Sequence, residues 1–273
     1  MAAPVLVSLG AQQEGGVPTS LQPLFDEGVF EEVVCLTAMP SDPNRYWLDV
    51  IAALPRSVDT ALIVPHGVDV TRDLLRLGSM LNEGTAAVFP LSMQHEVARP
   101  LMKAGESLAL SADDMNTWLN RYAVGTPVEV PVLAGYCAWL NVAQLRHITA
   151  STDHELSLSL RQAGHSILLS DEAFVDDTVL GMPLRLGQDL PESIVVALTD
   201  RHPYTALRHP LSELNAAQQA PPQTLARGAS TILHISHSWG GGLSRWISDF
   251  CAADEQHTHL ILKSIGTRKA GAQ

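Results

Sequence analysis

Residues 60–70 read TALIVPHGVDV, an apolar run that stops at Pro65-His66-Gly67 and is followed by one acidic residue, Asp69. A short apolar run bounded by proline and glycine predicts a buried β-strand. Residues 71–82 follow with leucines at helical spacing, which predicts an amphipathic helix. A strand that leads into a helix is the repeating unit of an α/β sheet.

The same alternation continues on both sides of this stretch. Apolar runs at 5–9, 32–36 and 86–91 predict further strands, and residues 46–54 have helical spacing. Such alternation predicts an α/β fold with a mostly parallel sheet and helices on both faces. Ligands of these sheets bind beyond the carboxyl ends of the strands. That rule directs attention to Gly10–Gly16, to Pro65–Asp69 and to the segment after Leu91. Residues 99–121 have no regular pattern and are expected to be a polar surface excursion.

The last quarter of the chain has its own strand–helix–strand pattern. Residues 216–227 lack periodicity and contain a proline pair, which predicts a linker. We therefore divide the chain into a domain at 1–212, a linker at 213–229 and a βαβ fragment at 230–273. A fragment of this size is below what usually folds alone.

Composition and charge argue against some classes of function. The chain has 273 residues, 46% of them hydrophobic, and a net charge of −12, which argues against nucleic acid as the main partner. Cys35, Cys137 and Cys251 are odd in number and widely spaced, so we expect reduced packing residues and a cytoplasmic protein. The start has no basic signal-peptide region, and the apolar runs are shorter than the roughly 20 residues that span a bilayer.

The eleven histidines show no familiar metal-ligand spacing. His234 and His237 are three residues apart at a strand end and are expected to face different sides, and the histidines at 202, 209, 257 and 259 are scattered. We expect surface or capping roles for them.

Residues 61–70 resemble the strand that ends in the DxD motif of the GT-A glycosyltransferases of family 2, the enzymes of bacterial surface polysaccharide assembly. In that motif two carboxylates hold a divalent ion on the donor diphosphate. Gly67-Val68-Asp69 keeps one of the two. The resemblance implies a GT-A-like, Rossmann-type domain in which Gly10 and Asp69 bind the donor and Asp69 ligates Mg²⁺ or Mn²⁺. The alternative for Asp69 is a helix cap or turn residue.

Residues 127–140 resemble the acceptor side of the same family, where a Gly-aromatic-Cys turn leads into an apolar strand. The resemblance implies that Tyr136 or Trp139 binds the acceptor by stacking on a sugar face. The alternative for both is ordinary core packing.

A third stretch, Asp153-His-Glu155 running into a helix, resembles the family's acidic motif, in which a carboxylate deprotonates the acceptor hydroxyl. It implies Glu155, or else Asp153, as the catalytic base, and the alternative is helix-dipole stabilisation by acids in a first turn. The family places a histidine after its Phe-Val pair, where this chain has Asp176-Asp177.

Residues 232–246, ILHISHSWGGGLSRW, resemble the first strand and glycine loop of a family 4 GT-B glycosyltransferase. This resemblance implies that Gly240, Gly241 and Gly242 approach a donor phosphate or sugar at a helix N-terminus. The alternative is a tight strand–helix turn.

Together the resemblances imply a glycosyltransferase-related protein of hexosyltransferase type. It would transfer a sugar from a nucleotide-sugar to a cell-surface polysaccharide or lipopolysaccharide acceptor, with inversion. Its partners would be the nucleotide-sugar, the glycan acceptor, membrane-bound assembly machinery at its periphery and a second copy of the chain. Two alternatives stay open: a non-catalytic GT-A-like binding or scaffold module that has lost donor and metal residues, and an unrelated α/β nucleotide-binding protein.

Overall fold

The computed structural model describes residues 4–10, 21–26, 28, 30, 32–93, 101, 110–180, 202–219, 231–237, 242–254 and 257–264. Contacts between Cα atoms divide the chain into two compact units, Met1–Ala216 and Ala217–Gln273. The boundary falls inside helix α8 (Arg208–Gln219), so the first part of the predicted linker, residues 213–219, is helical.

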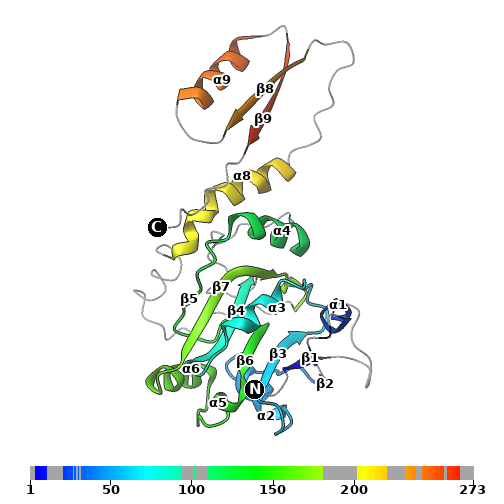
Figure 1. Cartoon of the computed structure of the whole chain (residues 1–273), viewed down its shortest axis with the longest axis vertical. Helices are drawn as coiled ribbons and strands as arrows, with labels where there is room; N and C mark the ends of the chain where they lie inside the picture. The colour runs from blue at the N-terminus through cyan, green and yellow to red at the C-terminus, as the bar shows by residue number, and fades with distance from the viewer. Residues whose placement is uncertain are drawn as a thin grey trace. The chain divides into compact units, whose positions relative to one another are not determined.

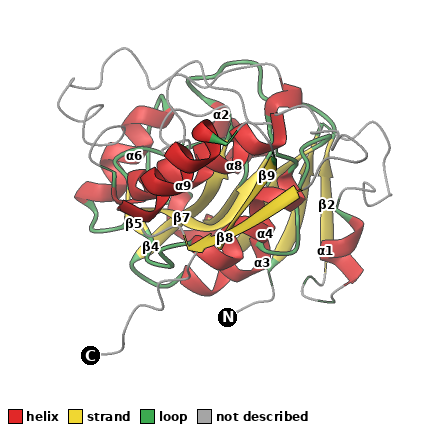
Figure 2. Ribbon diagram, turned by 90° about the horizontal axis from the view of Figure 1, so that it is seen from above, coloured by secondary structure: helices red, strands yellow, loops and turns green. Residues whose placement is uncertain are grey.

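Seven strands of the first unit form one sheet in the order β2-β1-β3-β6-β4-β7-β5 (Figure 1). They are β1 (Val5–Leu9), β2 (Glu32–Leu36), β3 (Thr60–Pro65), β4 (Thr85–Ser92), β5 (Val128–Glu129), β6 (Ala138–Asn141) and β7 (Ser166–Val175). The short strand β6 pairs antiparallel with both β3 and β4, and β5 pairs antiparallel with β7. The other five strands therefore run in one direction, with β2 at an edge of the sheet (Figure 2).

Helices cover both faces of this sheet. Successive side chains of a strand point to opposite faces, so each buried strand contributes to an apolar cluster on either face. In β1, Val5, Val7 and Leu9 join one apolar cluster and Leu6 joins the other. The first cluster includes residues of α2 (Tyr46–Ala53), α4 (Ala112–Tyr122), α5 (Val142–Leu145) and α6 (Asp153–Gln162). The second includes residues of α1 (Gln22–Asp26) and α3 (Leu74–Leu77). The predicted α/β fold with a mostly parallel sheet is confirmed.

Two local predictions are wrong. The polar excursion expected over 99–121 contains α4, whose N-cap Ser111 accepts a hydrogen bond from the backbone N–H of Asp114 and which buries Met115, Trp118 and Leu119. The helix expected over 71–82 is limited to α3 and the short 3₁₀ helix η1 (Gly78–Met80). At Gly78 an added Cβ would lie 3.0 Å from Trp139 Cζ2, so this segment packs tightly on the sheet.

Short 3₁₀ helices follow β7 and precede α8: η2 (Thr178–Leu180) and η3 (Pro203–Leu207). Before η3, the buried imidazole of His202 caps the helix by accepting a hydrogen bond from the backbone N–H of Tyr204. Burial, together with the charge of Arg208, lowers the pKa of His202 to about 4.

The described part of the second unit contains a strand, a helix and a second strand. Its two strands, β8 (Thr231–His237) and β9 (Thr258–Ser264), pair in parallel, and helix α9 (Gly242–Ala253) connects them. Leu233, Ile235 and Ile261 on these strands are 56%, 71% and 44% exposed. The unit therefore leaves apolar strand surface in contact with solvent.

Candidate functional site

The five parallel strands end at one edge of the sheet, and the strand order reverses there. In the sheet, β2 lies on one side of β1 and β3, whereas β4 lies on the other side of them. The chain therefore moves in opposite directions along the sheet after β1 and after β3. Between β1 and β3, the backbone N–H of His66 donates to the carbonyl of Leu9 at 2.7 Å. In open α/β sheets, ligands bind in the crevice outside the carboxyl ends of strands at such a reversal. We call this edge, beyond Leu9 and Pro65, the carboxyl edge.

Gly10 ends β1 at the carboxyl edge and has a structural reason to be glycine. Its φ is +76°, and an added Cβ would lie 2.9 Å from Cγ of Met39. Its N–H donates to the carbonyl of Leu36 at 2.6 Å, which ties the end of β1 to β2. The predicted donor contact of Gly10 stays a prediction.

At the end of β3, Pro65 to Val68 form a β-turn closed by a 3.3 Å hydrogen bond from Val68 N–H to the carbonyl of Pro65. Its third residue, Gly67, has φ +83°, and this position of a type II turn requires a positive φ. The turn therefore accounts for glycine at the place where the DxD motif has its first carboxylate.

Asp69 pairs with the residue that follows β7. Its backbone N–H donates to the carbonyl of Asp176 at 3.2 Å, and the N–H of Asp176 donates back at 3.3 Å. Two residues that exchange both hydrogen bonds of an antiparallel bridge place their side chains on the same side of it. Asp69 is exposed and Asp176 half-buried. The N-cap of the following helix α3 is Asp73, so Asp69 is not a helix cap. A second carboxylate, that of Asp176, lies beside it.

The next residue, Asp177, is fully buried at the same edge. One carboxylate oxygen accepts from the hydroxyl of Ser92 at 2.6 Å, and the other accepts from the backbone N–H of Met93 at 3.1 Å. Burial and the charge of Asp177 raise the pKa of Tyr136 to about 12 and raise that of the Cys137 thiol. Asp177 joins the ends of β4 and β7. Two acids directly after a buried strand were the sequence signal for this pair.

Asp153 lies in the first turn of α6. The last turn of α6 leads to the start of β7, so its first turn lies at the other end, at the carboxyl edge. Its two carboxylate oxygens accept from the backbone N–H groups of Trp47 at 2.9 Å and Leu48 at 3.0 Å. Asp153 therefore caps helix α2. Burial raises its pKa to about 6, and the two backbone N–H groups offset only part of that effect.

Glu155 lies two residues after Asp153, in the same first turn of α6, and is exposed. Its N–H donates to the hydroxyl oxygen of Thr152 at 3.2 Å, and its carboxylate accepts from the N–H of Ser151 at 2.8 Å. This arrangement resembles a capping box. Both predicted bases thus have helix-capping roles, and their catalytic role stays a prediction.

Tyr136 and Trp139, predicted to stack on a sugar, are core residues with exposures of 1% and 3%. The ring of Tyr136 packs edge-on against Tyr46, at 5.0 Å between centroids. The indole of Trp139 stacks on Phe30 and donates to the carbonyl of Leu74 at 2.7 Å. Core packing, the alternative for both residues, is what the structure shows.

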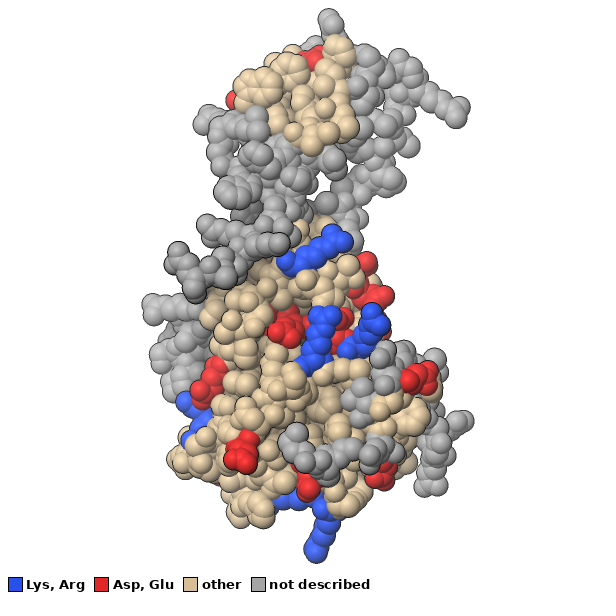
Figure 3. Space-filling view, in the orientation of Figure 1, with Lys and Arg blue, Asp and Glu red and all other residues tan. Residues whose placement is uncertain are grey.

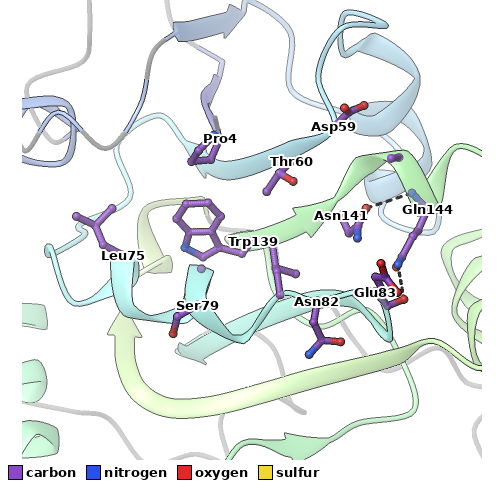
Figure 4. A pocket seen from close by; sticks show the side chains of 13 residues that line it. Pro4, Asp59, Thr60, Leu75, Ser79, Asn82, Glu83, Trp139, Asn141 and Gln144 are labelled. Atoms are coloured by element: carbon purple, nitrogen blue, oxygen red, sulfur yellow. Dashed lines mark hydrogen bonds between the residues drawn. The ribbon is translucent and has the colours of Figure 1, made fainter. Parts of the chain in front are cut away.

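A pocket of about 450 Å³ lies at the opposite edge, where the parallel strands begin (Figure 4). Asp59 and Thr60 lie at the start of β3, and Asn82 and Glu83 precede β4. Trp139 also lines this pocket. It contains none of the residues predicted to bind a donor or to act as a base.

Of the predicted glycine loop, Gly240 and Gly241 lie outside the described residues, and Gly242 begins α9. The expectation of scattered histidines in this unit is wrong. His234, His257 and His259 lie close together, with Cys251 and Asp254 beside them.

On the face shown in Figure 3, the described basic side chains are interspersed with acidic ones. Within the first unit, Arg76 lies 3.2 Å from Asp73. None of the described helices has both the length and the apolar character needed to cross a bilayer.

No protein-family model matches the chain, and no curated protein matches it. Among solved structures, it is similar to GalNAc-T7 in a crystal structure with UDP, GalNAc and Mn²⁺. The TM-score is 0.34 and the sequence identity 10%, over 64% of this chain and 43% of that chain. The α/β assignment rests on the strand order of the sheet and not on this likeness.

Proposed function

We propose that the chain is a glycosyltransferase-related protein that binds a nucleotide-sugar at the carboxyl edge, beyond β1 and β3. The observation that carries the proposal is the backbone bridge between Asp69 and Asp176, which sets two carboxylates on one side of the chain next to the reversal in strand order. A nucleotide diphosphate needs a counter-charge in that position. A divalent ion held by carboxylate oxygen would supply it.

The donor set fits Mg²⁺ or Mn²⁺. Both are hard cations that prefer oxygen ligands, and Mg²⁺ is commonly held by one or two carboxylates, substrate phosphates and water. Asp69 is exposed, whereas Asp176 is half-buried and its carboxylate already accepts from the N–H and hydroxyl of Thr178. We assign Asp69 as the direct ligand and Asp176 as its neighbour. When bound, the ion would neutralise charge on the leaving diphosphate.

For the acceptor side we propose Glu155 as the base that takes the proton of the attacking hydroxyl. Glu155 is exposed and lies in the first turn of α6. Asp153 has its two carboxylate oxygens on the backbone of α2 and holds that turn in place. The acceptor in this proposal is a cell-surface polysaccharide or lipopolysaccharide, reached at the cytoplasmic face of membrane-bound assembly machinery.

Isothermal titration calorimetry tests donor binding. UDP, GDP and dTDP are each titrated into the full chain with and without Mn²⁺. We expect at least one nucleotide to bind with a dissociation constant between about 1 μM and 1 mM, and more tightly with Mn²⁺. Asp69→Asn should weaken that binding by at least about tenfold, or 1.4 kcal/mol.

Asp113→Asn is the matched control, because Asp113 is an exposed aspartate in the first turn of α4. It should bind the nucleotide as the wild type does. Absence of heat with all three nucleotides in the presence of Mn²⁺ contradicts the proposal.

The second candidate is a non-catalytic binding or scaffold module. It is favoured by Gly67, which stands where the resemblance would place the first DxD carboxylate. This candidate predicts that a glycan binds while none of the three nucleotides does. The same titrations therefore distinguish the two candidates.

A further inference from the structure

Three side chains with metal-binding atoms meet inside the second unit. His234 comes from β8, Cys251 from the last turn of α9, and His259 from β9. Their ligand atoms lie within 4.8 Å of one another. Nε2 of His234 and Nδ1 of His259 face each other at 2.9 Å. The three elements of the unit thus converge on one point.

Asp254 lies on the far side of the His259 ring. Its Oδ2 is 3.3 Å from Nε2 of His259 and 2.8 Å from Nδ1 of His257. Nε2 of His259 is buried and completes no hydrogen bond with any described residue. A carboxylate behind one ring nitrogen favours the proton on that nitrogen, which leaves the lone pair of the other one for a metal.

We propose that the second unit binds a zinc-class divalent ion through Nε2 of His234, Nδ1 of His259 and Sγ of Cys251, with Asp254 orienting His259. Two imidazoles and a thiolate are ligands that zinc prefers, whereas Mg²⁺ and Mn²⁺ prefer oxygen. Tetrahedral bonds of about 2.0–2.3 Å place neighbouring ligand atoms somewhat more than 3 Å apart. The two imidazoles therefore separate slightly and the thiol moves inward when the ion enters.

Binding has a definite proton balance. The ligand form of Cys251 is the thiolate, so one proton leaves its thiol for the solvent. Before binding, Nε2 of His234 donates the hydrogen bond to Nδ1 of His259. When the ion binds, neutral His234 carries this proton on Nδ1 instead. No oxidation or reduction takes place. A fourth position remains for water.

The ion would also explain how so small a unit is stable. Residues 217–273 form the unit, and its described strands leave Leu233 and Ile235 exposed. Small domains with little buried surface commonly depend on a metal or a disulfide. One ion would link β8, α9 and β9 directly.

Metal reconstitution of the full chain, produced without a polyhistidine tag and stripped with a chelator, tests the site. With Zn²⁺ we expect about one equivalent per chain after gel filtration, measured by elemental analysis. With Co²⁺ we expect a thiolate-to-cobalt charge-transfer band in the near ultraviolet. Cys251→Ser and His234→Asn should each lose most of the bound Zn²⁺, and Cys251→Ser should lose the band.

Cys35→Ser and His147→Asn are matched controls from the first unit and should retain both signals. Asp254→Asn should keep the band while its affinity for Zn²⁺ falls by about 10- to 100-fold. A wild-type chain that takes up no Zn²⁺, or gives no charge-transfer band, overturns the proposal even if a variant fails to fold. Uptake that is equal in Cys251→Ser and the wild type overturns it as well. These results are independent of nucleotide binding at the carboxyl edge.

Discussion

Gly67 shows how one backbone angle limits which residues a position accepts. It is the third residue of the turn that ends β3, with φ +83°. An L-residue in this region crowds its Cβ against the neighbouring carbonyl, at a cost of about 1–2 kcal/mol. The position therefore favours glycine over an aspartate.

Gly67→Ala should lower the free energy of unfolding by about 1 kcal/mol. The cost comes from the backbone, because an added Cβ would meet only the methyl groups of Val179 at 3.7 Å, an ordinary contact. Urea unfolding followed by circular dichroism measures it. His66→Ala, in the same turn and also exposed, should stay within about 0.5 kcal/mol of the wild type. An equal effect of both variants would contradict the strain at Gly67.

Sequence reasoning placed Asp69 beyond the end of a strand and Asp153 at the start of a helix, because strand ends and helix starts can be recognised locally. It could not find Asp176 as the neighbour of Asp69, because more than one hundred residues separate the two and only the bridge joins them. The cluster of His234, Cys251 and His259 was missed for the same reason: its ligands come from three separate elements.

At the scale of elements, helix α2 is capped by residues far along the chain. Its own N-cap, Arg45, makes no side-chain capping hydrogen bond. Asp153 supplies the acceptors for its first turn. At the other end the guanidinium of Arg146 donates to the carbonyls of Leu54, Pro55, Arg56 and Val58. A carboxylate at the N-terminus and a cation at the C-terminus both match the helix dipole.

The burial of Asp153 predicts a pH dependence. The folded chain holds the proton of Asp153 with a pKa of about 6, above the ordinary 3.8. Such a group contributes most stability below pH 4 and loses that contribution as the pH rises through 6. The stability of the wild type relative to Asp153→Asn should therefore fall by up to about 2 kcal/mol between pH 4 and 7.

Denaturant unfolding of both proteins across this pH range measures the difference. Asp113→Asn, with an exposed carboxylate, should follow the wild type throughout. A difference between wild type and Asp153→Asn that does not change with pH would show that burial does not raise the pKa.

Helix α4 was not predicted, because its N-cap and its apolar residues lie within a segment, 99–121, that was expected to be an irregular polar excursion. Ser111 and Asp114 form its capping pair, and Met115, Trp118 and Leu119 form a short apolar stripe. The stripe spans only five residues, which is little more than one turn and too short to show the helical period. Helix α2 was predicted well because its aromatic and aliphatic residues extend through most of its length.

At the scale of the whole molecule, the strand–helix alternation predicted the class of fold but not the strand order. The insertion of antiparallel β6 between β3 and β4 follows from long-range pairing, with Leu140 opposite both Ala61 and Ala87. That order sets the reversal between β1 and β3 and therefore the position of the candidate donor site. The described pocket at the opposite edge offers an alternative place for a ligand.

Anomalous diffraction at the manganese edge, from crystals of the full chain grown with Mn²⁺ and the nucleotide that binds best, tests the central claim most directly. We predict a manganese peak about 2.0–2.6 Å from a carboxylate oxygen of Asp69, with the diphosphate beside it at the carboxyl edge. A nucleotide bound in the pocket beside Asp59 and Glu83, or a manganese ion held away from Asp69, would contradict the account.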